Sequence, residues 1–277
     1  MKVTKETVTS RKNPLVMLAA SLSEKKYRDA NGLFVANGYK LCREAVATGA
    51  PVQHVLLHEE YAATHLKEIV SLFSAPRYED TVLTVLSAGC FEKISTEKAP
   101  EGIILLIKYL DISKKYNKII DVGFSDGIGT AVMLFSVRDP GNLGAVLRSA
   151  GAFGATTVLL SEDCADLYSP RAVRAAMGAV FRVPTVRITN VREAIGALRA
   201  GGRRVLAAEL RENAVPLSSL TLSRKDVFVI GNEGHGIPTE ISALCDGSVY
   251  LPIAEGTESL NAAAAATVFL WEQSKCK

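Results

Sequence analysis

Short apolar runs rich in β-branched residues alternate with helical patterns over the second half of the chain. The expected strands are 131–137, 156–160, 184–188, 203–208, 226–230 and Val249–Leu251, and the expected helices are 143–153, 169–178, 191–200, one from Pro238 and a last one to Ser274. This alternation predicts an α/β fold in which helices cover both faces of a parallel sheet. Ligands of such sheets bind beyond the carboxyl ends of the strands. The three loops that follow residues 137, 230 and 251 are therefore the candidate site.

The first part of the chain alternates in the same way and predicts a smaller α/β domain of its own. Its expected helices are Leu15–Arg28, Tyr39–Thr48 with Gly49 as its stop, Tyr61–Phe73 and Val82–Ala88, and its expected strands are Leu33–Ala36, Val52–His58 and Ile103–Ile107. Residues 109–130 mix charges, glycine and short apolar pieces, which favours a linker with one local element near Ile119–Val122. We therefore expect domains at 1–110 and 131–277, joined by a linker at 111–130.

The composition is that of a globular protein with a sizeable core. Of the 277 residues, 48% are hydrophobic and 22% are charged. The net charge of +3 is too small to indicate nucleic-acid binding by itself, although it allows local basic patches. Composition therefore leaves the class of partner open.

Cysteine and histidine usage favours a reduced, cytoplasmic protein without a metal site. The cysteines are Cys42, Cys90, Cys164, Cys245 and Cys276, an odd number without a C-x-x-C. His54 and His58 bracket a β-like run, and no histidine combines with cysteine at metal-ligand spacing. The polar N-terminus does not resemble a signal peptide, and the apolar run Leu260–Trp271 is too short to span a bilayer.

The first candidate loop contains an asparagine, a glycine and an arginine at the start of a helix. Gly144 and Arg148 are four residues apart and share a helix face. Asn142 is either the N-cap of this helix or a site residue. Arg148 is either a solvated helix residue or, because its neighbours are small and apolar, a contact for an anion or a sugar.

The other two loops also carry polar residues at strand ends. The segment Gly231-Asn-Glu-Gly-His-Gly236 lets the backbone approach a ligand and holds Glu233 between glycines. His235 is either an acid or base residue or merely exposed. Ser259 and Asn261 stand at the start of the last helix, where either can be a cap.

Three motifs in order identify a resemblance. N-x-G-x-x-x-R at 142–148, G-N-E-G-x-G at 231–236 and L-P-…-E-S-L-N-A-A-A-A at 251–265 resemble the motifs of the SpoU/TrmH family of RNA ribose 2′-O-methyltransferases, in the SPOUT superfamily. The stretches SEKKYRDANGLFVANGYKLCREAV and KAPEGIILLIK resemble that family's RNA substrate-binding domain, which is akin to the ribosomal proteins that hold kinked (kink-turn) RNA. The second resemblance has Asn37-Gly38 where relatives usually have Glu-Gly.

The resemblance implies a SPOUT catalytic domain at 131–277 with a deep trefoil knot, S-adenosylmethionine as cofactor, no metal, and a homodimer. It implies catalytic roles for Arg148, Asn142, Glu233, Ser259 and Asn261, and cofactor contacts at Gly231, Leu251, Leu260, Ile253 and Gly234. We interpret Arg148 as a bidentate grip on an RNA phosphate, because a guanidinium stays protonated and is a poor base. As a further hypothesis, RNA phosphates contact Arg138, Arg171, Arg174, Lys25, Lys26 and Arg28.

The implied reaction is methylation of a ribose 2′-hydroxyl in RNA, and the N-terminal resemblance favours 23S ribosomal RNA in the cytoplasm. Methylation of transfer RNA and a catalytically inactive RNA-binding module are the alternatives. An ordinary nucleotide-binding enzyme is disfavoured, because neither G-x-G-x-x-G nor a P-loop follows an early strand.

Overall fold

The computed structural model describes residues 1–96, 99–110, 129–232, 234–254, 256 and 259–276. Contacts divide the chain into two compact units. The first unit is Met1–Leu110 with Tyr168–Phe181, and the second is Asp111–Leu167 with Arg182–Lys277. The expected catalytic domain at 131–277 thus includes a short segment, 168–181, whose contacts lie within the first unit. The local element expected near Ile119–Val122 falls outside the described residues.

The second unit contains a seven-stranded sheet in which all neighbouring strands are parallel, as the alternation predicted. Its strands, in spatial order, are β10 (Val215–Pro216), β12 (Gly247–Tyr250), β9 (Arg204–Ala208), β11 (Asp226–Ile230), β6 (Ala131–Leu134), β7 (Thr157–Ser161) and β8 (Thr185–Ile188). Because β11 lies between β9 and β6, its carboxyl end is next to the loops that follow both neighbours.

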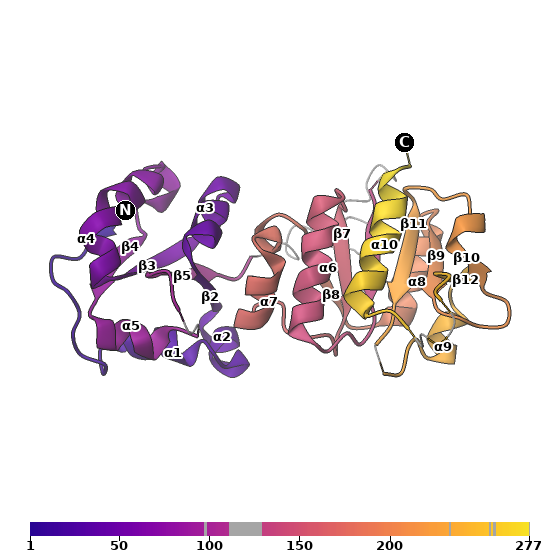
Figure 1. The fold of residues 1–277 in the computed structure, drawn as a ribbon, viewed down its shortest axis with the longest axis horizontal. Coiled ribbons are helices and arrows are strands. Elements are labelled where there is room, and N and C mark those ends of the chain that lie inside the picture. Colours follow the sequence, from indigo (N-terminus) through magenta and orange to yellow (C-terminus); the bar gives the residue numbers. More distant parts are fainter. Residues whose placement is uncertain (97–98, 111–128, 233, 255, 257–258, 277) are drawn as a thin grey trace. The chain divides into compact units, whose positions relative to one another are not determined.

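Helices cover both faces of this sheet (Figure 1). The helices of the unit are α6 (Pro140–Ala152), α8 (Val191–Ala200), α9 (Thr239–Ser242) and α10 (Ala262–Ser274), with a 3-10 turn at Leu217–Ser219. Side chains alternate along β11, so Val227 and Val229 pack in one core cluster with α8. Phe228 points the other way, and its ring lies 4.6 Å from that of Phe269 on α10. Helix α10 also packs along α6, which brings the starts of these two helices together.

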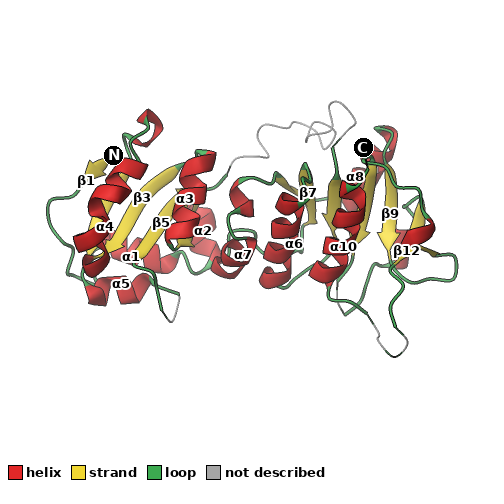
Figure 2. Ribbon diagram, turned by 45° about the horizontal axis from the view of Figure 1, so that its top comes forward, coloured by secondary structure: helices red, strands yellow, loops and turns green. Residues whose placement is uncertain are grey.

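The first unit contains a five-stranded mixed sheet flanked by helices (Figure 2). Its strands, in spatial order, are β1 (Lys2–Val3), β4 (Val82–Leu86), β3 (Val52–His58), β5 (Ile103–Lys108) and β2 (Leu33–Asn37). Its helices are α1 (Pro14–Ser21), α2 (Lys25–Asn31), α3 (Tyr39–Thr48), α4 (Glu59–Leu72), α5 (Ala88–Ile94) and α7 (Pro170–Ala176), with 3-10 turns at Pro76–Tyr78 and Ala179–Phe181. Helices α1 and α5 share one core cluster with the sheet.

Two expected helices of this unit are wrong. Residues 82–86 form the strand β4, which pairs in parallel with β3 and β1, and the helix begins only at Ala88. The expected helix Leu15–Arg28 is two helices, because the chain turns at residues 22–24. The end of α3 is as expected, since Gly49 adopts the left-handed conformation (φ 71°) that stops the helix.

Candidate active site

A cavity of about 830 Å³ lies at the carboxyl ends of β9, β11 and β12. Its lining comes from these strand ends, from the loops after β9, β11 and β12, and from α10. Of the residues expected to contact a cofactor, Gly231, Leu251, Ile253 and Leu260 line it. Gly234 lies in the same loop as Gly231 and is not among the described lining residues. Of the three loops predicted for the site, those after residues 230 and 251 line this cavity, whereas the loop after residue 137 is not among the described lining residues and residues 209–211 after β9 are.

Gly231 is glycine because the chain folds back onto it. A Cβ built there would lie 2.5 Å from the carbonyl carbon of Gly236 and 2.6 Å from its oxygen. Asn232 and Gly236 close this turn through two backbone hydrogen bonds, of 3.3 and 2.8 Å. The loop therefore forms a tight wall of the cavity. Glu233, expected to be catalytic, lies outside the described residues, so its role stays a prediction.

The first and third loops meet through a pair of asparagines. The N-cap of α6 is Asp139, whose carboxylate accepts from the backbone N–H of Asn142 at 2.9 Å, so the interpretation of Asn142 as the cap is wrong. The side-chain Oδ1 of Asn142 instead accepts from Nδ2 of Asn261 at 3.0 Å. Asn261 is also the N-cap of α10, with Oδ1 accepting from the N–H groups of Ala263 and Ala264 at 2.9 and 3.3 Å. One asparagine thus both starts a helix and joins two motifs.

Arg148 and Ser259 are accessible from solvent. Ser259 lines the cavity. The guanidinium of Arg148 projects from α6 and makes no hydrogen bond or ion pair with residues that the structure describes. The structure therefore unites Asn142 with Asn261 and places Ser259 at the cavity, while Arg148 is not bonded to any of the three.

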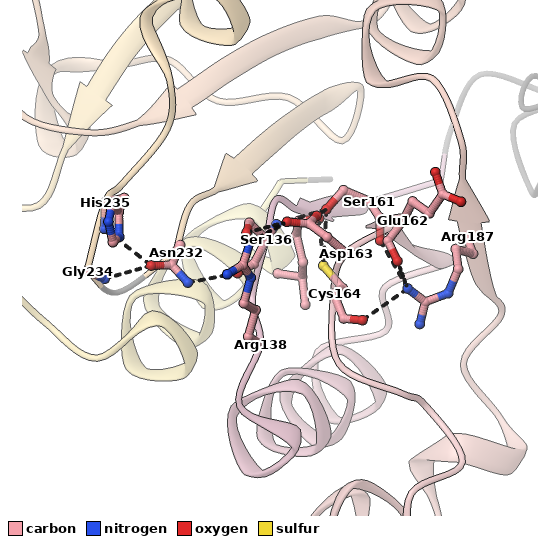
Figure 3. A network of polar contacts seen from close by, with 11 residues as sticks. Ser136, Arg138, Ser161, Glu162, Asp163, Cys164, Arg187, Asn232, Gly234 and His235 are labelled. Carbon is pink, nitrogen blue, oxygen red and sulfur yellow. Dashed lines mark hydrogen bonds and ion pairs between the residues drawn. The ribbon is translucent and has the colours of Figure 1, made fainter. Parts of the chain in front are cut away.

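A polar network that the sequence did not predict supports the glycine-rich loop (Figure 3). Asn232 donates through Nδ2 to the carbonyl of Ser136 at 2.8 Å and accepts at Oδ1 from the N–H groups of Gly234 and His235, at 2.8 and 3.2 Å. Ser136 in turn donates through its hydroxyl to Asp163 at 2.5 Å. Asn232 belongs to the second motif, so the sequence could have indicated it as a site residue. Asp163 belongs to none of the three motifs, so no sequence signal indicates it.

Most of the expected RNA contacts are exposed. Lys25 pairs with Asp29, Lys26 with Glu24 at 3.1 Å, and Arg138 with Asp163 at 3.3 Å. The other two exposed arginines, Arg171 and Arg174, lie on α7.

Arg28 is the exception, and its expected role on the surface is wrong. The residue is only 3% exposed, and its guanidinium donates to the carbonyls of Leu22 and Ser23 at 2.7 and 2.8 Å. Arg28 therefore closes the turn between α1 and α2, where a phosphate cannot reach it.

The cysteines are all free thiols. Burial raises the pKa of Cys42 to about 12 and that of Cys245 to about 11, so neither is a ready nucleophile at neutral pH. Over the described residues, no group of three or more His, Cys, Asp or Glu side chains could hold a metal ion. Nor is any described helix long and apolar enough to cross a membrane.

Comparisons with known proteins cover nearly the whole chain. Residues 129–271 match the model of the SpoU rRNA Methylase family, and residues 13–105 match the MRM3-like substrate binding domain. A putative TrmH family tRNA/rRNA methyltransferase of Staphylococcus aureus is 28% identical over 85% of this chain and 93% of its own length. The 23S rRNA (guanosine(2553)-2′-O)-methyltransferase RlmP of Bacillus subtilis is 26% identical over 95% and 97%. The crystal structure of an AdoMet-bound rRNA methyltransferase from Sinorhizobium meliloti aligns with a TM-score of 0.83 at 30% identity, over 98% of this chain and 97% of that one.

Proposed function

Because the chain belongs to the SpoU rRNA methylase family, we propose that this RNA methyltransferase methylates a ribose 2′-hydroxyl in 23S ribosomal RNA. Bound S-adenosylmethionine supplies a methyl group activated by the sulfonium. The observation that carries the proposal is the cavity where the second and third motifs meet, beside the Asn142–Asn261 bond that adds the first motif. The sequence similarity to a 23S rRNA 2′-O-methyltransferase supports the choice of substrate.

The cavity fits S-adenosylmethionine in size and lining. Its volume of about 830 Å³ falls within the range of roughly 300–1,000 Å³ of small-ligand sites. Leu251, Ile253 and Leu260 offer apolar surface for a purine ring. Gly231 and its neighbours offer backbone groups instead of side chains, since a Cβ at Gly231 has no room. We assign these residues to the cofactor, with Gly234 as their neighbour in the loop.

The polar residues at the rim would orient the RNA. In the proposed mechanism Arg148 grips a phosphate with its two-pronged guanidinium, which holds the reactive ribose near the methyl group. Asn142, Asn261, Ser259 and Glu233 would hold the ribose, and they would contact Arg148 only once RNA is bound. The exposure of Arg148 in the protein alone is compatible with this role, because the phosphate partner would arrive with the RNA.

The substitution Arg148→Lys tests this role. Lysine keeps the charge and loses the planar fork, so we expect the single-turnover rate of methyl transfer to fall by about tenfold or more. Affinity for S-adenosylmethionine, measured by calorimetry, should stay unchanged. A full single-turnover rate with unchanged RNA affinity would contradict a bidentate role for Arg148.

The substrate is tested with RNA from a strain that lacks the gene. The purified enzyme and labelled cofactor should add a 2′-O-methyl group to the large-subunit ribosomal RNA of that strain, and mapping the label names the nucleotide. Labelling of transfer RNA instead would support the alternative substrate. Binding of RNA without any labelling would support an inactive RNA-binding module.

We assign RNA binding to the domain at 1–110 and catalysis to the domain at 131–277, for which we expect a trefoil knot. Lys25, Lys26, Arg138, Arg171 and Arg174 are exposed and supply positive charge for the phosphate backbone. Neutralising Arg171 and Arg174 should reduce the slope of log affinity against log salt by about one for each lost phosphate contact. An unchanged slope would reject the assignment.

A cytoplasmic location, where ribosomes are assembled, belongs to the same proposal.

The proposed form in solution is a homodimer. Helix α10 exposes Val268 and Trp271, which are 37% and 49% accessible. Phe153, at the end of α6, lies 5.5 Å from the Trp271 ring and extends the same apolar surface. A second copy of this chain that covers this surface would bring two catalytic domains together.

A further inference from the structure

Three loops at the carboxyl edge of the second unit's sheet are joined by one line of hydrogen bonds (Figure 3). The loop after β7 carries Asp163, the loop after β6 carries Ser136, and the loop after β11 carries Asn232. The line runs from the Asp163 carboxylate to the Ser136 hydroxyl, and from the Ser136 carbonyl to the Asn232 amide. Since β6 lies between β7 and β11, each bond joins neighbouring strand ends.

The middle of this line is a strained residue. Ser136 has a backbone φ of 57°, in the left-handed region that residues other than glycine rarely adopt. It is 8% exposed and bonded at three points. Its N–H donates to Oγ of Ser161 at 2.8 Å, its hydroxyl donates to Asp163 at 2.5 Å, and its carbonyl accepts from Asn232 at 2.8 Å. A conformation of this kind persists only where its surroundings hold it.

Asp163 itself is firmly placed. Its Oδ1 accepts from the Ser161 hydroxyl at 2.7 Å, and its Oδ2 accepts from Ser136 and from Arg138. Partial burial opposes the charge, yet the hydrogen bonds from Ser136, Ser161 and Arg138 together hold the pKa of Asp163 below its ordinary value. The carboxylate is therefore ionised at neutral pH.

The backbone around Asp163 is fixed by one arginine on β8. The guanidinium of Arg187 donates to four backbone carbonyls on either side of Asp163. These are the carbonyls of Ser161, Glu162, Cys164 and Ala165, at 3.1, 2.7, 3.1 and 2.8 Å. Such a clamp leaves the loop little freedom. Asp163 thus presents its carboxylate to Ser136 from a rigid support.

At the other end, the line reaches the wall of the cavity. Asn232 lines the cavity, and its Oδ1 accepts from two backbone N–H groups of the glycine-rich turn. Because the same amide is anchored on the Ser136 carbonyl, a shift of Ser136 would move this turn. The position of the turn next to Gly231 consequently depends on the conformation of Ser136.

We propose that Asp163 is a positioning residue for the cofactor: it holds Ser136 in its left-handed conformation and thereby fixes the turn 231–236 that forms one wall of the cavity. The inference rests on the proposed function in one respect, that this cavity receives S-adenosylmethionine. In this proposal Asp163 acts on the cavity through Ser136 and Asn232, while its bond to Arg138 lies outside this line.

The test measures the dissociation constant of S-adenosylmethionine by calorimetry, without RNA. In the Asp163→Ala variant we expect binding about tenfold weaker, the factor that corresponds to about 1.4 kcal/mol of lost hydrogen bonding to a charged group. Glu162→Gln is the matched control, because it removes a neighbouring negative charge whose carboxylate has no part in the line of bonds. Its dissociation constant should equal that of the wild type.

A second background separates positioning from general stability. Glycine adopts a left-handed φ without support, so Asp163 should matter less when residue 136 is glycine. We therefore expect the tenfold effect of Asp163→Ala to shrink to about threefold or less in the Ser136→Gly background. An equal factor in both backgrounds, or wild-type affinity in Asp163→Ala, would overturn the inference.

Thermal unfolding followed by circular dichroism checks that the variants are folded. If Asp163→Ala does not fold, Asp163→Asn replaces it in both backgrounds, since its amide oxygen can accept only part of the original bonds.

The proposed function and this inference are contradicted by different results. A wild-type protein that binds the cofactor without methylating RNA contradicts the proposed function alone, whereas a cofactor affinity indifferent to Asp163 contradicts this inference alone.

Discussion

Single residues decide the shape of the cavity wall, and Gly231 does so by having no side chain. The closest atoms to an added Cβ belong to the backbone of Gly236, so no rotamer change can relieve the overlap. By contrast, a Cβ added at Gly196 on α8 would meet no atom within 4 Å, and that glycine is not in a left-handed conformation. Two glycines of one unit thus have opposite tolerance for the same substitution.

Gly231→Ala should weaken binding of S-adenosylmethionine by at least about tenfold, because the turn 231–236 must move to admit the methyl group. Calorimetry measures the change. The matched control Gly196→Ala should keep wild-type affinity and raise the free energy of unfolding by about 0.5–1 kcal/mol, since alanine favours a helix over glycine. Wild-type affinity in Gly231→Ala would show that the turn is not a wall of the cofactor site.

At the scale of residues, the sequence could predict what short motifs of neighbouring residues determine. The family, the enzyme class and the cofactor are confirmed, since they follow from motifs that the chain carries in order. The burial of Arg28 was not predictable, because it depends on a turn at residues 22–24 that brings two carbonyls to its guanidinium. The role of Asp163 was equally hidden, since its bond to Ser136 joins residues 27 positions apart.

At the scale of elements, the local sequence pattern misjudged the short strand β4 as part of a helix. Residues 82–88 were expected as one helix, yet Val82–Leu86 form β4, whose pairing with β1 and β3 the local pattern does not show. The parallel sheet of the second unit was predictable, because each strand is followed by its own crossover helix or turn. The knot that the resemblance implies remains a prediction.

The strand β11 is tied to β9 by a side-chain pair at its start. Asp226 is 1% exposed, and its two oxygens accept from Nε and Nη2 of Arg204 at 2.9 and 2.7 Å. Arg204→Ala would leave this buried carboxylate with a hydrogen bond from the backbone N–H of Ser223, at 2.8 Å. We expect a loss of about 2 kcal/mol in the free energy of unfolding, measured by urea denaturation.

The control for this prediction is Arg199→Ala. Arg199 pairs with Asp246 at 2.8 Å, but that pair is more accessible, with side chains 50% and 27% exposed. Its removal should cost about 1 kcal/mol or less. A cost at Arg204 no larger than that at Arg199 would contradict a special role for the buried pair.

His54 on β3 gives the first unit a pH dependence. Burial lowers the pKa of His54 below its ordinary value of 6.5, and its Nδ1 has no hydrogen-bond partner among the described residues. The unfolded chain therefore binds a proton at His54 more readily than the folded chain. The contribution of neutral His54 to the free energy of unfolding is full above pH 6.5 and is lost as the pH falls through the lower pKa of the folded state. Urea unfolding at about pH 7.5 and about pH 5 should show a smaller loss in His54→Gln than in the wild type. Equal losses of the free energy of unfolding in His54→Gln and in the wild type would contradict His54 as the source of the pH dependence.

At the scale of the whole molecule, the proposed homodimer makes Trp271 a sensitive position. Trp271→Glu places a charge on the apolar surface of α10 and should shift the protein to monomers in sedimentation-velocity experiments. Met17→Glu is the matched control, because Met17 is also 49% exposed and lies in the first unit. It should leave the oligomeric state unchanged. A wild-type protein that sediments as a monomer would contradict the proposal.

The bond between Asn142 and Asn261 spans 119 positions of the chain and needs the last helix in place. During synthesis, the earlier strands can pair and their core can form while residues 259–274 are still inside the ribosome. The candidate site then lacks part of its third motif. A chain whose last helix has not yet folded therefore has an open cavity, because Ser259, Leu260 and the start of α10 form part of its lining.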